Sequence, residues 1–107
     1  FILSTQTKDS NTVWLAFPLT LRDSAPFSRQ EMQIFLEKRG IQTRVVFPGN
    51  IIRQPGFKHI EMRKSNEAYK EADKVMKGGI LLACHHGLIE PMITHIHQVV
   101  GEFLGKF

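Results

Sequence analysis

The chain has 107 residues, 42% of them hydrophobic and 22% charged, which is typical of one compact globular domain and argues against disorder. No apolar run approaches the ~20 residues of a membrane helix, and the first five residues lack the charged and apolar regions of a signal peptide. The net charge of +4 favours phosphorylated small molecules or nucleic acid, or else reflects a solvated basic face, and no long Lys/Arg block indicates a nucleic-acid arm.

The N-terminal part is predicted to form a loop and then a strand. Residues 4–12 are polar, whereas residues 13–21 are rich in apolar and aromatic side chains. Pro18 cannot donate a ladder hydrogen bond, so it belongs at a sheet edge or near the end of the strand. Both faces of this strand are apolar, which indicates that something outside the chain covers one of them.

The first helix has clear signals at both ends. Ser28 and Glu31 have the spacing of a capping box, which predicts a helix over residues 28–39. Gly40 is expected to end it, because glycine adopts the left-handed conformation that often follows a helix. A second strand is predicted over residues 41–47.

The second half begins with a long connection. Residues 48–63 contain two Pro-Gly turn signals and show no period, and such long loops are uncommon unless they are functional or disordered. A helix is then predicted from about residue 66 to residue 77, a buried strand over 80–84 and a final helix over 91–104.

This order of elements predicts an α/β fold. We expect residues 1–107 to form one two-layer small domain, with a three-stranded, mainly antiparallel sheet and about three helices on one face. The third strand is expected to lie between the first two, so that neighbouring strands run antiparallel. The chain lacks an initiator Met, which fits a piece of a longer protein.

The cysteine and histidines do not form a recognisable metal or nucleophile motif. Cys84 is the single cysteine, so no intrachain disulfide is possible and a reducing cytoplasm is the natural compartment. The spacing of Cys84 relative to the histidines matches no standard zinc pattern, and we expect no metal site. The histidines considered are His85, His86, His95 and His97. Adjacent residues of a strand point to opposite faces, so Cys84 and His85 are also poorly placed as a nucleophilic pair.

The long connection is the best candidate for a binding site. No acidic residue occurs between Gly40 and His59. Arg44 and Arg53 supply forked donors for a phosphate or carboxylate, and Asn50 and Gln54 offer groups that bind hydroxyls. The alternative is a surface loop with scattered arginines. No lysine stands out as a Schiff-base residue and no Gly-rich phosphate loop is present, so no catalytic residue is assigned.

Several motifs, in order and over nearly the whole chain, resemble the C-terminal domain of the DegT/DnrJ/EryC1/StrS aminotransferase family. Within that family they are closest to the nucleotide-sugar 3-dehydrase branch, which contains CDP-4-keto-6-deoxyglucose 3-dehydrase and GDP-4-keto-6-deoxymannose 3-dehydratase. The residues that carry the resemblance are Trp14-Leu15-Ala16-Phe17-Pro18-Leu19-Thr20, Ala25-Pro26-Phe27-Ser28-Arg29, Gly40-Ile41-Gln42-Thr43-Arg44, Phe47-Pro48-Gly49-Asn50, Arg53-Gln54-Pro55-Gly56-Phe57 and Cys84-His85-His86-Gly87-Leu88.

The resemblance implies a fold type I enzyme whose large domain, absent here, holds pyridoxal phosphate (PLP) or pyridoxamine phosphate (PMP) and the catalytic Lys or His. This chain would bind no cofactor itself and would be inactive alone. Its partners would be the large domain, a second subunit of a cytoplasmic homodimer and a nucleotide-diphosphate sugar used in lipopolysaccharide biosynthesis, not nucleic acid or a membrane. Arg44, Asn50, Arg53 and Gln54 would then face the nucleotide-sugar cleft.

Two residues depart from the family pattern. Ile89 stands where a Ser or Thr would cap the last helix, and Pro48 stands where a small residue, usually Ala, is expected. The sequence leaves the sugar, the nucleotide base and the choice between dehydration and transamination open. It also leaves open a stand-alone basic module that binds a nucleotide or RNA, and a purely structural interaction domain.

Overall fold

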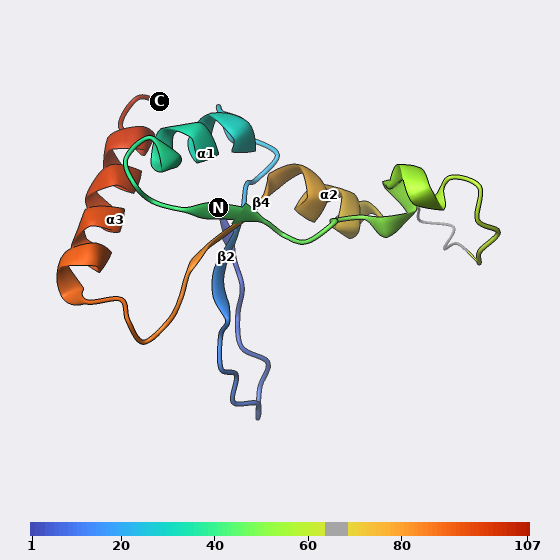
Figure 1. Ribbon diagram of the computed structural model, residues 1–107, viewed down its shortest axis with the longest axis horizontal. Coiled ribbons are helices and arrows are strands. Elements are labelled where there is room, and N and C mark those ends of the chain that lie inside the picture. The colour runs from blue at the N-terminus through green and yellow to red at the C-terminus, as the bar shows by residue number, and fades with distance from the viewer. Residues whose placement is uncertain (64–68) are drawn as a thin grey trace.

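The computed structural model describes residues 1–63 and 69–107, and its centre is a four-stranded antiparallel sheet (Figure 1). The strands lie in the order β1-β2-β4-β3. Their bounds are Ile2–Leu3 for β1, Ala16–Thr20 for β2, Thr43–Val45 for β3 and Gly79–Ala83 for β4. The last strand in sequence therefore lies between β2 and β3, as predicted, and every neighbouring pair is antiparallel.

The register of the sheet places the core on one face. Phe17 pairs with Leu82, and Leu19 pairs with Ile80, so alternate residues of β2 and β4 point to the same side. Two helices cover this side and close the core over it. The buried apolar residues are Leu19, Leu21, Met32, Leu36, Ile41, Ile80, Leu82, Val99 and Phe103.

The two covering helices are α1 (Arg29–Glu37) and α3 (Glu90–Leu104). The predicted capping box begins α1: the Ser28 side chain accepts from the Glu31 backbone, and the Glu31 carboxylate accepts from Ser28 N–H at 2.7 Å. By contrast, Ile89 at the start of α3 makes no side-chain cap. The helix still begins there because Pro91 in its first turn has no N–H that needs a partner.

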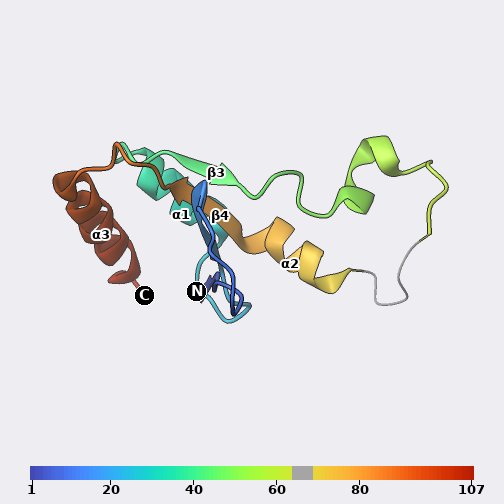
Figure 2. The ribbon, with the colours of Figure 1, turned by 90° about the horizontal axis from the view of Figure 1, so that it is seen from below.

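The third helix, α2 (Lys70–Gly78), continues directly into β4. It extends away from the sheet on the side opposite to α3, whereas α1 lies beside the strands (Figure 2). The predicted start of this helix, near residue 66, lies outside the described residues. Its last residue, Gly78, is buried, with its backbone carbonyl accepting from Leu21 N–H at 3.0 Å.

No helix formed by the described residues lies on the second face of the sheet. Pro18 and Leu81 pair on this face and are half-buried, and Arg44 pairs with Leu81 beside them. The connection from β1 to β2 projects away from the body as an arm (Figure 1), in which Val13 and Leu15 are 87% and 94% exposed. The strand predicted over residues 13–21 is observed only at Ala16–Thr20, so Val13 and Leu15 belong to the connection and not to a face of the sheet.

The expected α/β class is confirmed, but the sheet has four strands where three were predicted. The additional strand, β1, has two residues, too few to show an alternating pattern in the sequence. It forms because the chain folds back as a hairpin, so that Ile2 pairs with Thr20 and Leu3 with Leu19. Among the described residues, no helix is long and apolar enough to span a membrane.

Candidate functional site

The long connection after β3 lies alongside α2 (Figure 2). It contains two short 3-10 turns, η1 (Ile51–Arg53) and η2 (Pro55–Phe57). Gly49 has a φ of +67° and packs so tightly on α2 that a Cβ atom there would overlap the side chain of Met76. The sequence supplies glycine where both the backbone conformation and the close approach require it.

One carboxylate on α2 holds this loop through two side chains. Asp73 Oδ1 accepts from Asn50 Nδ2 at 2.7 Å and from Arg53 Nε at 3.1 Å, and its Oδ2 accepts from Arg53 Nη2 at 2.8 Å. Asn50 is 3% exposed, and its Oδ1 also accepts from Ile52 N–H at 3.3 Å, which caps η1. The two donors therefore fix the start and the end of the first turn of the loop.

The hydrogen bonds of this cluster favour its charged forms. The bonds from Arg53 and then from Asn50 lower the pKa of Asp73, and the bonds to Asp73 raise the pKa of Arg53 above its ordinary value. The side chains of Arg53 and Asp73 are 49% and 35% exposed, so water screens the pair. The arrangement orders the loop more than it stabilises the fold.

Gln54 and the loop backbone line a shallow pocket of about 320 Å³ between the loop and α2. Gln54 Nε2 donates to Pro48 O at 2.6 Å, which closes one side of the loop. Arg29 reaches the same pocket from α1 and donates to Met76 O at 2.7 Å. Phe47 at the rim is 80% exposed with a φ of +46°, an uncommon conformation for a bulky residue and one often found at binding sites.

The structure brings together three of the four predicted site residues. Asn50, Arg53 and Gln54 all belong to the loop, whereas Arg44 lies on the open face of the sheet, exposed and paired with Leu81. Sequence reasoning missed Asp73. Its spacing of 20 residues from Arg53 follows from the fold alone, and no local sequence signal predicts the pair.

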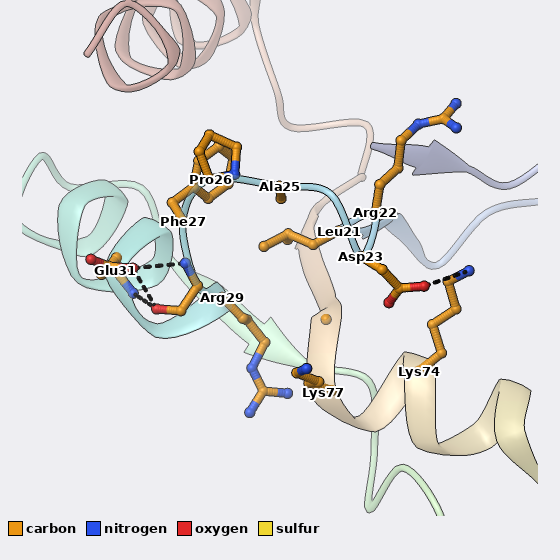
Figure 3. Close-up of a pocket in the computed structure, with 12 residues that line it drawn as sticks. Leu21, Arg22, Asp23, Ala25, Pro26, Phe27, Arg29, Glu31, Lys74 and Lys77 are labelled. Atoms are coloured by element: carbon orange, nitrogen blue, oxygen red, sulfur yellow. Dashed lines mark hydrogen bonds and ion pairs between the residues drawn. The ribbon is translucent and has the colours of Figure 1, made fainter. Parts of the chain in front are cut away.

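A second hollow, of about 330 Å³, lies between the start of α1 and the end of α2 (Figure 3). Arg29 and Lys77 point into the same region, and Lys74 pairs with Asp23 at 3.6 Å. The capping box at the start of α1 uses the N–H groups of Ser28 and Glu31, and its Glu31 carboxylate would repel an anion. We assign no binding role to this hollow.

Of the five histidines, His85 and His86 lie side by side, with ring centroids 6.4 Å apart, and the others lie elsewhere in the described part of the chain. His85 Nδ1 accepts from Gly87 N–H at 3.1 Å, and His95 Nε2 lies 2.9 Å from Arg39 O. No group of three His, Cys, Asp or Glu side chains that could hold a metal gathers among these residues. Cys84 is half-buried at the end of β4 and free.

Comparison with known proteins assigns nearly the whole chain to one family. Residues 1–101 match the model of the DegT/DnrJ/EryC1/StrS aminotransferase family. The chain is 31% identical over 105 residues to dTDP-4-dehydro-2,6-dideoxy-D-glucose 3-dehydratase of Saccharopolyspora spinosa, and 31% identical over 99 residues to the lipopolysaccharide biosynthesis protein RfbH of Salmonella typhimurium. These matches cover 98% and 92% of this chain, but 22% of each relative.

Solved structures agree on the fold. A DegT/DnrJ/EryC1/StrS aminotransferase from Brucella abortus superimposes with a TM-score of 0.76 at 15% identity, over 94% of this chain and 25% of that one. A GDP-4-keto-6-deoxymannose-3-dehydratase, solved with a trapped PLP-glutamate geminal diamine, also gives 0.76, at 19% identity and over 91% and 25% of the two chains. This chain thus spans about a quarter of the length of its relatives.

Proposed function

Because the chain belongs to the DegT/DnrJ/EryC1/StrS aminotransferase family, we propose that it is the C-terminal small domain of an enzyme that uses PLP or PMP to modify a nucleotide-linked 4-keto-6-deoxy sugar. The observation that carries the proposal is the basic loop held against α2, where Arg53 and Gln54 lie together in the stretch between Gly40 and His59 that contains no acidic residue. The relatives named as 3-dehydratases favour dehydration over transamination.

We further propose that this chain does not hold the cofactor itself. A Schiff-base lysine requires an enclosed, desolvated pocket. Lys74 pairs with Asp23, and Lys77 is exposed at the mouth of an open hollow. In the proposal the cofactor and its catalytic residue therefore belong to the large domain, and this chain alone is inactive.

The proposed contribution of this chain is to bind the substrate and the other parts of the enzyme. Arg53 and Gln54, with Asn50 behind them, are proposed to face the nucleotide-sugar cleft, together with Arg44 from the neighbouring strand. The open face of the sheet and the exposed arm at 4–15 are proposed to contact the large domain or the second subunit of a cytoplasmic homodimer, because large apolar patches mark interfaces.

The test of the activity uses the full-length enzyme. Purified with PLP and glutamate, it is offered CDP-, dTDP- and GDP-linked 4-keto-6-deoxyhexoses, and the products are identified by mass spectrometry. A keto sugar in which hydrogen has replaced a ring hydroxyl, with release of ammonia, supports a dehydratase, and exchange of an oxo group for an amino group supports an aminotransferase. An enzyme that neither binds nor converts any of the three sugars contradicts the proposal.

Arg53→Ala tests the site. A charge-assisted hydrogen bond contributes about 1.5–3 kcal/mol, so kcat/KM should fall about 10- to 150-fold. Exposed ion pairs contribute only about 0–1 kcal/mol to folding, so the melting temperature should change little. Both are measured on the same preparations.

Arg39→Ala is the matched control, because Arg39 also forms an exposed ion pair, with Glu102 at 3.4 Å, but lies outside the loop. It should leave kcat/KM unchanged. Equal kinetics for Arg53→Ala and the native enzyme would remove Arg53 from the site, and a large loss of stability would assign it a structural role instead.

A further inference from the structure

The pairing of Arg53 with Asp73 leaves part of the guanidinium group available. An arginine side chain has five N–H donors in a rigid plane. Asp73 takes one from Nε and one from Nη2, and no further hydrogen bond of Arg53 is found within the described part of the chain. Three donors remain: one on Nη1 and one on Nη2 form the outer edge of the group, and the second N–H of Nη1 points back along the side chain.

The orientation of this outer edge is fixed by Asp73. Because the guanidinium is planar, a bidentate bond on one edge sets the direction of the other. Asp73 is itself held by Asn50, which is buried and bonded at 2.7 Å, and it lies on a helix that runs into β4, one of the two inner strands of the sheet. The outer edge of Arg53 is therefore anchored to the body of the domain.

We infer that Asp73 is a positioning residue, which holds Arg53 so that its outer edge binds the diphosphate of the nucleotide sugar with two parallel hydrogen bonds. The inference rests on the proposed function and deepens it by naming the ligand group that this side chain meets. A pair of N–H groups on one edge matches two phosphate oxygens, whereas a sugar hydroxyl would use one of them.

The two possible roles of Asp73, through its charge or through the orientation of Arg53, predict opposite effects of its removal on phosphate binding. If the carboxylate acted only through its charge, its removal would strengthen the attraction of the loop for a phosphate. If it orients Arg53, its removal frees the side chain to adopt many rotamers, and binding weakens. Asp73→Asn therefore separates the two by the direction of the change.

The test measures binding of CDP, dTDP and GDP to the full-length PLP enzyme by titration calorimetry, without the sugar or turnover. Asp73→Asn should raise the Kd of the nucleotide that binds best by about tenfold or more, the loss of one charge-assisted hydrogen bond. Asp23→Asn removes the same charge from the other ion pair of α2, with Lys74, and should leave the Kd unchanged.

Two further variants show whether Asp73 acts through Arg53. In an Arg53→Gln background, Asp73→Asn should cause little additional loss, because there is no guanidinium left to orient. Arg53→Lys keeps the charge and a single bond to Asp73 but lacks the second edge, so it should fold normally and lose about tenfold in binding. Arg53→Lys still tests whether the guanidinium binds the phosphate through two bonds, even if Asp73→Asn destabilises the loop.

The outcomes are distinct. A wild-type enzyme that binds none of the three nucleotides overturns the proposed function together with this inference. If the wild-type enzyme binds a nucleotide, any one of three results overturns the positioning role alone. Asp73→Asn binds as tightly as wild type or more tightly, the losses in the double variant are additive, or Arg53→Lys binds as tightly as wild type.

Discussion

Glu37 connects the end of α1 to the start of β3. Its carboxylate accepts from the Thr43 hydroxyl at 2.8 Å and from Thr43 N–H at 3.0 Å. These bonds, the hydroxyl first, lower the pKa of Glu37. Thr43 is buried, and its hydroxyl also accepts from Gln33 Nε2 at 3.0 Å, so the three side chains satisfy one another at the edge of the core.

This network predicts a dependence of stability on acid. Because the folded-state pKa of Glu37 is lower than that of the unfolded chain, its contribution is present above the unfolded value of about 4.3 and is lost as the pH falls through the lowered folded value. Glu31, whose pKa is lowered by its bonds to Ser28, and Asp73 act in the same direction. The free energy of unfolding should therefore fall below about pH 5.

Glu37→Gln checks the contribution of one carboxylate. The amide oxygen keeps an acceptor for Thr43 but does not titrate, so the decrease of the unfolding free energy between about pH 6 and pH 3 should become shallower. Urea unfolding at a series of pH values measures it, with the neutral-pH difference as the internal reference. Parallel pH curves for the two proteins would show that this carboxylate has no part in the acid response.

At the scale of single elements, two glycines in left-handed conformations test how tightly the candidate loop packs. Gly40 after α1 has a φ of +77° and no atom within 4 Å of a Cβ built there, whereas Gly49 in the loop has a φ of +67° and would clash with Met76 on α2. Gly40→Ala should cost about 1–2 kcal/mol, the strain of the backbone alone. Gly49→Ala should cost more, because the clash adds to that strain.

Chemical denaturation of both variants measures this difference, and Gly40→Ala serves as the control for Gly49→Ala. The clash should also displace the loop from α2, so Gly49→Ala in the full-length enzyme should weaken nucleotide binding where Gly40→Ala does not. Equal costs for the two substitutions would mean that the loop does not rest on α2.

Elements with local signals could be predicted from the sequence, and elements that depend on distant partners could not. The capping box at Ser28 and Glu31 lies within one turn, and the helix that it begins is observed at Arg29–Glu37. The strand predicted over 41–47 is only Thr43–Val45, because the chain turns at Phe47 to follow α2. The pairing of Asp73 with Arg53 could not be predicted from the sequence either, because it exists only after α2 and the loop pack together.

At the scale of the whole molecule, the chain exposes more apolar surface than a small domain in isolation would favour. Val13 and Leu15 lie in the part of the projecting arm that leads into β2, and they are 87% and 94% exposed. Phe17, at the base of the arm, lines an apolar groove of about 540 Å³ between the sheet and α3. Large exposed apolar patches usually mark interfaces, which suits a domain that contacts a larger body.

The isolated chain is therefore expected to self-associate as its concentration rises, because Leu15 and its neighbours leave water when two copies meet. Burial of one such side chain contributes about 1.5–3 kcal/mol, so Leu15→Lys should weaken association by about tenfold or more. Sedimentation velocity over a range of concentrations measures the change.

Ile34→Lys, at a half-exposed site on α1 away from the arm, is the matched control and should associate like the native chain. A native chain that stays monomeric at high concentration, or equal effects of the two lysines, would show that the arm is not an interface.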